Sequence, residues 1–328
     1  MSPYFLAFLS PALVLLAAAV GGPAALLPPI VLFGLLPIID QWLPLNRQNA
    51  LGPSTLRFLP IAYVPVHIGV LAYALTAIVG AESVLVGALL TLSTGIGTAL
   101  AINVAHELMH RPGRSEQALA AVIMAAASYT HFCVEHVHGH HKNVGTRHDP
   151  ATARLGEPLH RYLPRTLGGG LRSAWRIEAA RPIARNRMVR FAAGYALLVT
   201  GILVAFGPMG LAAFLGQSVV AVLMLETINY VEHYGLEREE IAPGRPKRVA
   251  PHHSWNSAHR VANWMLFNLA RHSDHHAFAG RPFRELRHHD DVPQLPASYP
   301  AMMLLAMVPT LWFRVMNPRV DAARRMAA

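Results

Sequence analysis

Residues 84–110 read VLVGALLTLSTGIGTALAINVAHELMH, and this stretch decides the fold. Its first part, 84–105, contains no charged side chain and is long enough to cross a bilayer as a helix, which takes about 20 apolar residues. It runs without interruption into His106 and His110, which are four residues apart and therefore share one face of a continuing helix. The stretch predicts a membrane span that ends in two potential metal ligands.

Further apolar stretches of similar length occur along the chain. Together with the first they cover 4–20, 24–39, 58–79, 84–105, 189–206 and 211–231. With 53% hydrophobic and only 14% charged residues, the chain of 328 residues is too apolar for a soluble two-domain enzyme. We therefore predict an all-α integral membrane protein built on a bundle of six transmembrane helices. The stretch 4–20 has no basic leading region, so we expect a retained span and not a signal peptide.

The 28 basic residues predict how the spans are oriented. All of them fall in the connection 41–57, in the segment 111–190 or after Gly235. With an even number of spans these segments share one side, which the positive-inside rule makes cytoplasmic, together with both termini. Topology then explains the net charge of +10, and we expect no nucleic-acid partner.

Two other segments are predicted to stay out of the membrane core. The apolar run 117–132 would carry the following histidines to the wrong side if it spanned the bilayer, so we expect a helix buried against the bundle or lying at the interface. The basic stretch Arg181–Arg190 is typical of a helix end that faces solvent or lipid headgroups. The prediction is one catalytic domain over 1–328, with a cytoplasmic cap formed by 106–188 and 232–328.

Four histidine-rich boxes lie at or beyond the cytoplasmic ends of the predicted helices. They read HELMH at 106–110, EHVHGHH at 135–141, NYVEHYG at 229–235 and RHSDHH at 271–276. Nine of their histidines have the spacing of metal ligands: His106, His110, His136, His140, His141, His233, His272, His275 and His276. One ion takes four to six ligands, so nine imply two metal ions. The single cysteine, Cys133, excludes a thiolate-held zinc or iron–sulfur site.

The spacing within the boxes suggests which imidazoles share a helical face. His136 and His140 form a second pair four residues apart, with His141 beside it, and Gly139 leaves room for a metal or a neighbouring helix. His138 points away from this pair, behind the ligands or into solvent. His233 stands alone in its box, so this box by itself favours an interfacial histidine over a metal ligand.

Ligand type by itself leaves the metal open, because imidazole binds iron, copper, zinc and nickel. A zinc metalloprotease, with Glu107 as general base, would use only two of the nine histidines. A metal transporter would place its ligands near the middle of the bilayer and not at the helix ends. Both alternatives are therefore disfavoured.

The four boxes, together with HHSWNSAHRVANWMLFNLARHSDHH at 252–276, resemble the membrane-bound alkane monooxygenase family of integral-membrane desaturases and hydroxylases. The resemblance implies a protein of the bacterial inner membrane in which all nine histidines hold two non-haem iron ions. It implies that O2 supplies one oxygen atom to an unactivated C–H bond, usually of a terminal methyl group, giving a primary alcohol. Its electrons would come from a rubredoxin or ferredoxin with an NAD(P)H-dependent reductase.

The resemblance implies the reaction but leaves two classes of substrate open. The segment 142–150 departs from the form found in n-alkane hydroxylases and leans toward the xylene and cymene methyl-hydroxylase branch. The substrate is therefore an alkane or an alkyl-aromatic compound. Desaturation or oxidative decarboxylation of a fatty acyl chain remains the main alternative, since the same metal centre could remove a second hydrogen. Oxidising a strong C–H bond needs a redox-active metal, which excludes zinc.

Three further sets of residues are expected to serve the centre. Carboxylates that accept the remaining N–H of bound imidazoles are Glu107, Glu135, Asp149, Glu232 and Asp274. A hydrocarbon channel is expected among the second, third and fourth spans, with Leu32 and Phe33 limiting chain length. Basic residues that would dock an acidic electron donor are Arg238, Arg245, Lys247, Arg248, Arg281, Arg284 and Arg287.

Overall fold

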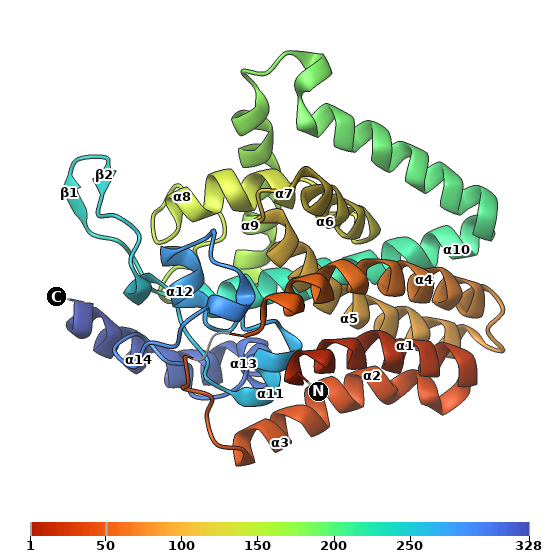
Figure 1. The fold of residues 1–328 in the computed structure, drawn as a ribbon, viewed down its shortest axis with the longest axis horizontal. Helices are drawn as coiled ribbons and strands as arrows, with labels where there is room; N and C mark the ends of the chain where they lie inside the picture. The colour runs from red at the N-terminus through yellow and green to blue at the C-terminus, as the bar shows by residue number, and fades with distance from the viewer. Residues whose placement is uncertain (1, 50–51, 328) are drawn as a thin grey trace.

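The computed structural model describes residues 2–49 and 52–327, and nearly all of its regular structure is helical (Figure 1). Within these residues the only sheet is a hairpin of β1, Glu240–Ala242, and β2, Arg245–Pro246. The predicted all-α class is confirmed. Long apolar helices lie side by side, and shorter elements gather at one end of them.

The N-terminal region forms a helical hairpin. Its first limb is a 3-10 segment, η1 (Pro3–Phe8), that continues into α1 (Leu9–Val20). Gly21 and Gly22 make the turn with φ of 70° and 50°, a region that glycine reaches without a steric penalty. The second limb changes helix type repeatedly because its prolines donate no backbone hydrogen bond. It comprises η2 (Gly22–Leu26), α2 (Leu27–Pro29), the π-helical η3 (Ile30–Leu35) and α3 (Leu36–Trp42).

The centre of the bundle is α5, Val84–Met109, which contacts α1, α4, α6 and α10. A short segment, η4 (Ser54–Phe58), leads into α4 (Leu59–Val79) before it. Close packing around α5 depends on small residues: a Cβ atom at Gly95 would lie 2.5 Å from the Cβ atom of Val220 on α10. Because α5 is held on several sides, its last turn carries His106 in a fixed position.

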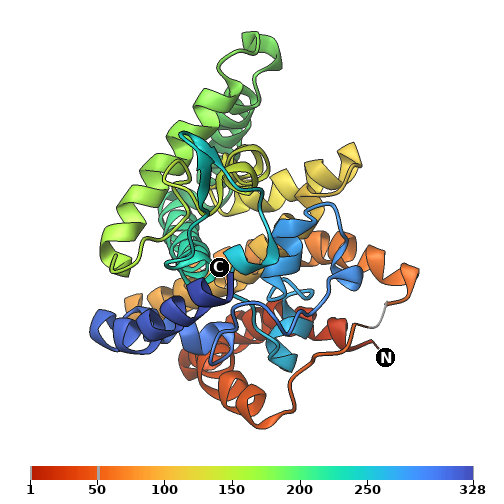
Figure 2. The same ribbon diagram turned by 90° about the vertical axis from the view of Figure 1, so that its left-hand side faces the viewer.

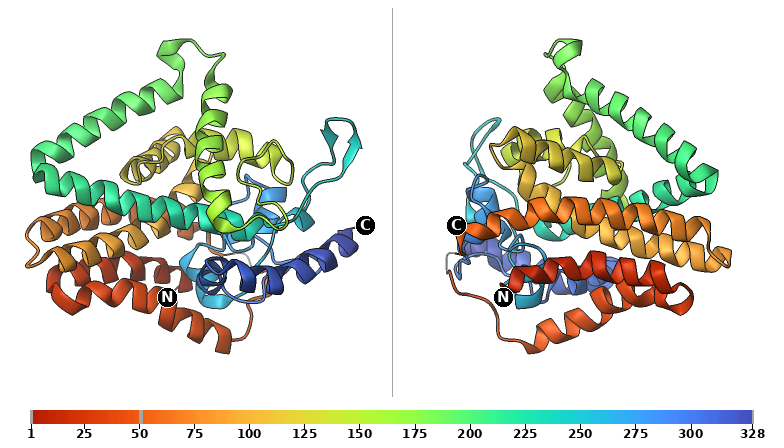
Figure 3. Two further views of the ribbon diagram at one scale, coloured as in Figure 1. Left: turned by 180° about the vertical axis from the view of Figure 1, so that it is seen from behind. Right: turned by 45° about the vertical axis from the view of Figure 1, so that its right-hand side comes forward.

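The next long helix, α10 (Arg187–His233), is broken in the middle. Gly207 has a φ of 68° and leaves the helical conformation, and Pro208, which has no N–H to extend the first arm, begins the second. Figures 1 and 3 show the first arm, 187–206, standing away from the bundle and the second arm, 208–233, returning beside α4 and α5. Five helices are long and apolar enough to cross a membrane when α10 is taken as one, and the break divides it into the two stretches that the sequence predicts separately.

The segment between α5 and α10 does not form another span. Helix α6 (Arg114–Ala126) has 13 residues, too few to cross a bilayer, and packs against α5 with one face, which includes Ile123 and Met124, while Val122 on the other face is exposed. After it come α7 (Phe132–Glu135), the π-helical turn η5 (His136–His140), α8 (His141–Asn143), α9 (Leu159–Glu178) and η6 (Ile183–Arg185).

The C-terminal third covers the end of the bundle that carries the histidines, and Figure 2 looks onto this end. It contains η7 (Pro251–His253), α11 (Arg260–Met265), α12 (His272–Ala277), η8 (Phe283–Glu285), α13 (Tyr299–Ala306) and α14 (Pro309–Ala327). Asp40 at the end of the N-terminal hairpin accepts hydrogen bonds from the backbone N–H groups of Val261 and Ala262, at 2.7 and 2.9 Å. A carboxylate at this position satisfies the free amides at the start of α11 and ties the cap to the bundle.

Candidate metal centre

The structure brings the nine predicted histidines together, and it sorts them into two groups. The five-histidine group comprises His106, His110, His136, His141 and His275, and the four-histidine group comprises His140, His233, His272 and His276. Within each group one nitrogen of every imidazole lies within 4.8 Å of the others. Each group draws on several elements, so the centre exists only when α5, the η5 turn, α10 and α12 are packed together.

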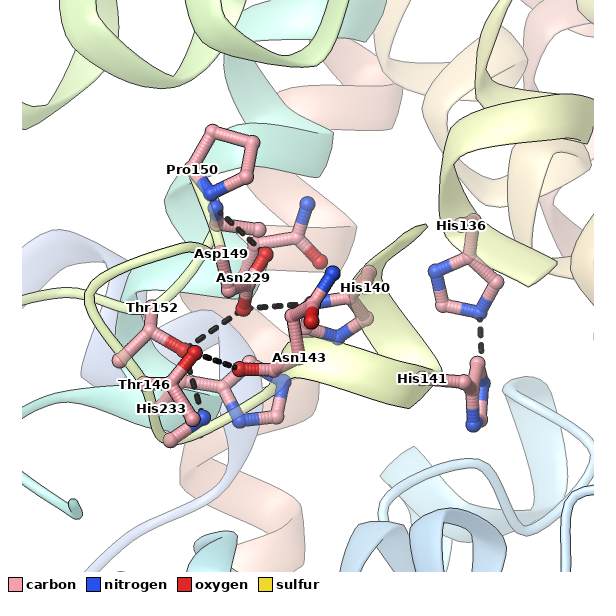
Figure 4. A network of polar contacts seen from close by, with 12 residues as sticks. His136, His140, His141, Asn143, Thr146, Asp149, Pro150, Thr152, Asn229 and His233 are labelled. Carbon is pink, nitrogen blue, oxygen red and sulfur yellow. Dashed lines mark hydrogen bonds and ion pairs between the residues drawn. The ribbon is translucent and has the colours of Figure 1, made fainter. Parts of the chain in front are cut away.

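The π-helical turn η5 decides the sorting within the second box. It brings His136 and His141, five residues apart, to one side, with their Nε2 atoms 3.1 Å apart, while His140 joins the other group. Figure 4 shows His136 facing His141, and His140 facing Asp149. The predicted pair His136 and His140 do lie next to each other, with ring centroids 5.2 Å apart, but their ligand nitrogens belong to different groups, because the turn is π-helical and not α-helical.

Helix α12 divides its histidines in the same way. The Nε2 atom of His272 lies 3.0 Å from that of His276 and 3.1 Å from that of His233, all in the four-histidine group. His275 points to the five-histidine group, with its Nε2 atom 3.1 Å from that of His141. The solitary box histidine, His233, is completely buried and lies within this arrangement. His138, in contrast, is exposed, in agreement with the prediction that it is not a ligand.

The nitrogen positions fit bound metal ions. Two nitrogens that each lie about 2.1 Å from one ion are roughly 3 Å apart when they are neighbouring ligands, and the observed contacts have this separation. The Nε2 atoms of His106, His110 and His140 are buried and have no hydrogen-bond partner among the described residues. A buried nitrogen without a partner is costly unless something else occupies its lone pair.

Protonation also favours metal binding in the five-histidine group. Burial, reinforced by neighbouring imidazoles, lowers the pKa of His110 to about 3 and holds the pKa values of His136, His141 and His275 well below their ordinary value. His140 is the exception. Burial would lower its pKa, but the nearby Asp149 carboxylate outweighs burial and raises it. The lowered pKa values keep the imidazoles of the five-histidine group neutral, which is the form that binds metals.

Asp149 is placed as the sequence predicts for a carboxylate behind a ligand. Its Oδ2 atom lies 2.9 Å from Nδ1 of His140, so that Nδ1–H donates to it and the Nε2 lone pair faces the four-histidine group (Figure 4). The Thr152 hydroxyl donates to Oδ2 at 2.6 Å and the Ala151 N–H donates to Oδ1 at 3.0 Å. These donors fix the carboxylate, which in turn fixes the ring.

Glu232 also contacts the four-histidine group, but from a different side than expected. Its Oε2 atom lies 3.2 Å from Nε2 of His272, the same nitrogen that faces His233 and His276. The carboxylate therefore lies among the converging nitrogens and not behind a ring. This places a second acidic side chain beside the same group as Asp149.

The other three predicted carboxylates have no hydrogen bond to any of the nine histidines among the described residues. Glu107 accepts from Arg111 and from the Phe283 N–H. Asp274 accepts from Arg281, His289 and the Arg287 N–H. Both carboxylates therefore order the loop 278–289, and the prediction that they orient a ligand ring is corrected, because their hydrogen bonds go to groups of this loop and to Arg111.

Glu135 occupies a narrow space between the η5 turn and α9. A Cβ atom at Gly139 would lie 2.4 Å from its Oε1 atom and 3.1 Å from the Ser173 hydroxyl, so Gly139 is required for this close approach. Burial raises the pKa of Glu135 to about 8. Gly139 therefore accommodates a neighbouring helix, one of the two roles that the sequence suggests for it.

An apolar pocket leads from the N-terminal hairpin to both histidine groups. Leu32 and Phe33 line its far end, and His106, His136 and His272 line its near end. The third predicted span contributes no lining residue within the described chain, which corrects the expected channel position. Its place is taken by residues that sequence reasoning missed: Met224, Leu225, Ile228, Val261, Met265 and Met303. The apolar spacing of 261 and 265 between two histidine boxes was the available signal.

The predicted docking residues fall into two kinds. Arg245, Arg248 and Arg287 are exposed. Arg281 and Arg284 pair with acidic side chains of the cap, and Lys247 pairs with Glu239. Arg238 donates to the carbonyl oxygens of Lys142 and Lys247. Only the three exposed arginines can therefore contact a partner without breaking an ion pair or a hydrogen bond within the cap.

A bundle of apolar helices that carries two clusters of imidazoles at one end defines the class: a multi-pass membrane enzyme with a histidine-held, non-haem metal site. The chain matches the fatty acid desaturase family model over residues 82–306. It is 41% identical to alkane 1-monooxygenases 1 and 2 of Pseudomonas aeruginosa over 314 residues, which is 89% of this chain and 82% and 83% of the two relatives.

A more distant relative acts as a useful contrast. The xylene/toluene monooxygenase hydroxylase component XylM of Pseudomonas putida is 26% identical over 220 residues, covering 64% of this chain and 58% of that protein. The chain belongs to the alkane 1-monooxygenase family, and the resemblance seen in the four boxes is confirmed.

Proposed function

We propose that this protein hydroxylates a methyl group of a hydrophobic hydrocarbon and that its preferred substrates are alkanes. The observation that carries the proposal is the apolar pocket, which begins at Leu32 and ends beside imidazoles of both histidine groups. A substrate without polar groups gains its binding free energy by burying apolar surface, and this lining provides that surface. The identity of 41% to alkane monooxygenases, against 26% to the xylene enzyme, supports an alkane over an alkyl-aromatic compound.

The nine histidines would hold two iron ions, one in each group. When bound, redox-active iron and O2 would supply the oxidising power that cleaving an alkyl C–H bond requires and that zinc lacks. The chain itself performs three tasks. Asp149 fixes the ring of His140, the pocket lining positions the hydrocarbon, and the buried surroundings keep bulk water from the reacting carbon.

The membrane arrangement completes the proposal. The two arms of α10 would each cross the bilayer, giving six spans, and the basic loops would place the histidine groups and both termini in the cytoplasm of a bacterial inner membrane. There an acidic rubredoxin or ferredoxin, reduced by an NAD(P)H-dependent reductase, would meet the exposed Arg245, Arg248 and Arg287.

The test is product analysis with isotopically labelled oxygen. Purified protein, rubredoxin, reductase and NADH are incubated with an n-alkane under 18O2, and the products are identified by mass spectrometry. A primary alcohol that carries one 18O atom is expected. An alkene formed from the alkane would instead support the desaturase alternative and contradict hydroxylation. The decarboxylase alternative is tested with a fatty acid in place of the alkane, from which it would give CO2 and an alkene one carbon shorter. The same preparation is assayed for iron, for which two ions per chain are expected.

A further inference from the structure

A second groove lies on the other side of the bundle, between α6 and the first arm of α10. It has a volume of about 740 Å³, within the usual range for ligand sites. The apolar substrate pocket does not share a lining residue with it among the described residues. Figures 1 and 3 show that this arm of α10 stands away from the bundle, with α6 facing it.

Each helix presents one face to the groove. On α6 the lining residues recur every three or four positions from Arg114 to Ala125, and on α10 they recur in the same way from Arg187 to Tyr195. On both helices the lining residues at the N-terminal end are basic, and most of those further along the helix are small or apolar. Because both helices start at the end of the bundle that carries the histidines, the two basic ends lie at the same level.

The basic end of the groove contains two arginines whose charges are not paired with any other described residue. Arg114 and Arg190 are exposed, and within the described residues neither guanidinium has a hydrogen bond or an ion pair. Arg187, by contrast, is paired with an acidic residue, since its Nε–H donates to the Glu178 carboxylate at 2.8 Å. No acidic residue lines the groove in the described part of the chain. An anion at this level would therefore meet two uncompensated guanidinium groups.

The remainder of the groove is mostly apolar and ends within the membrane region. Its walls are formed mainly by small and apolar side chains such as Ala121, Ala125 and Phe191, and the polar lining residues outside the basic end include Gln117, Thr130 and His138. The inner end is closed by Tyr195, whose hydroxyl donates to the Ser128 hydroxyl at 2.9 Å and so joins the arm to the turn after α6. Gly194 leaves the groove wide, because an added Cβ atom there would meet nothing within 4 Å.

We propose that this groove binds one anionic phospholipid, with its phosphate between Arg114 and Arg190 and an acyl chain along the apolar faces of α6 and α10. The charge and the position of the apolar walls fit this ligand, since a basic cluster at the headgroup level attracts anionic lipid and acyl chains pack on apolar helix faces. The lipid would fill the space that separates the first arm of α10 from the bundle and would support the arm that leads into the second, histidine-bearing arm.

The experiment measures lipid retained by the full-length protein. The protein is equilibrated in vesicles of phosphatidylcholine with phosphatidylglycerol, extracted in mild detergent, and its bound lipid is identified by mass spectrometry. About one phosphatidylglycerol per chain is expected after washing, with phosphatidylcholine competing poorly. The double variant Arg114→Gln, Arg190→Gln should lower the relative affinity roughly tenfold or more. The control Arg161→Gln removes an exposed arginine on α9 outside the groove and should change nothing.

A second pair of variants tests the apolar part. Gly194→Leu should displace the acyl chain without disturbing the packing, whereas Gly201→Leu, on the same arm with equally open space but outside the groove lining, should retain the lipid. Equal retention by Gly194→Leu and Gly201→Leu would overturn the proposal. So would equal retention by the arginine double variant and wild type. Displacement of the lipid by millimolar inorganic phosphate alone would also overturn it, because it would show that the site recognises the phosphate group without the acyl chain.

Discussion

The two histidine groups differ in how their imidazoles are supported. The four-histidine group is completely buried, and two carboxylates, Asp149 and Glu232, contact its rings. The five-histidine group is partly exposed at His110 and His141, and among the described residues no carboxylate contacts its rings. The four-histidine group therefore has fewer imidazoles but two carboxylates beside them. The five-histidine group has more imidazoles and no carboxylate beside them in the described part of the chain. Carboxylates behind or beside ligands raise their basicity, so the two groups should hold their ions differently.

The largest expected effect tests whether there are two separate ions. His233→Ala removes a ligand of the four-histidine group, and His275→Ala removes one of the five-histidine group. Each should lower iron from two to about one per chain and reduce turnover by at least about 100-fold, because even supporting residues typically contribute 10–100-fold. Iron is measured by elemental analysis.

The matched control is His138→Ala, which removes an exposed histidine of the same box as His136. It should keep both ions and full activity. Two ions retained in His233→Ala would show that the four-histidine group is not a separate metal site.

The next effect tests the carboxylate difference directly. Asp149→Asn keeps the shape of the side chain but removes the negative charge that holds Nδ1–H of His140. We expect activity and iron affinity to fall about 10–100-fold, with loss confined to the four-histidine ion. Titration with an iron chelator should remove that ion first.

Asp274→Asn is the comparison variant, since Asp274 lies in the fourth box but bonds to Arg281 and His289 and not to a ligand ring. Its iron content should match that of wild type, while the melting temperature should fall. Similar iron loss in the two variants would remove the distinction between a carboxylate that supports a ligand and one that orders a loop.

A smaller and more selective effect concerns the pocket that reaches both groups. Leu32→Trp enlarges a buried side chain at the far end of the pocket, so longer alkanes should lose roughly 10–200-fold in kcat/KM while the shortest accepted alkanes change little. Leu35→Trp, on the same segment but half exposed and outside the pocket, is the control. An equal loss across all chain lengths would exclude Leu32 from a chain-length role.

The smallest effect concerns electron delivery at the exposed side of the centre. Arg245→Gln with Arg248→Gln should reduce donor-dependent turnover a few-fold at low ionic strength and very little at high salt, because screening removes long-range attraction. Turnover is measured against donor concentration at several salt concentrations. A constant deficit at every salt concentration would mean that these residues support the fold of the hairpin and not donor encounter.

Much of this protein follows from its sequence by local rules. The apolar stretches predict the long helices, and the location of the Gly207 break agrees with the gap between the stretches ending at 206 and starting at 211. The four boxes identify the nine histidines and the family, because ligand type and short-range spacing are properties of consecutive residues.

Only the tertiary structure decided how these parts combine. A π-helical turn sends His140 to a different group than His136, and the packing of α12 against both groups divides His275 from its neighbours. Asp274 turns toward Arg281, and the pocket is lined by α10 and the cap where the sequence suggested the third span. In each case the outcome depends on which elements from distant parts of the chain pack together, and a helical periodicity describes only the element to which it belongs.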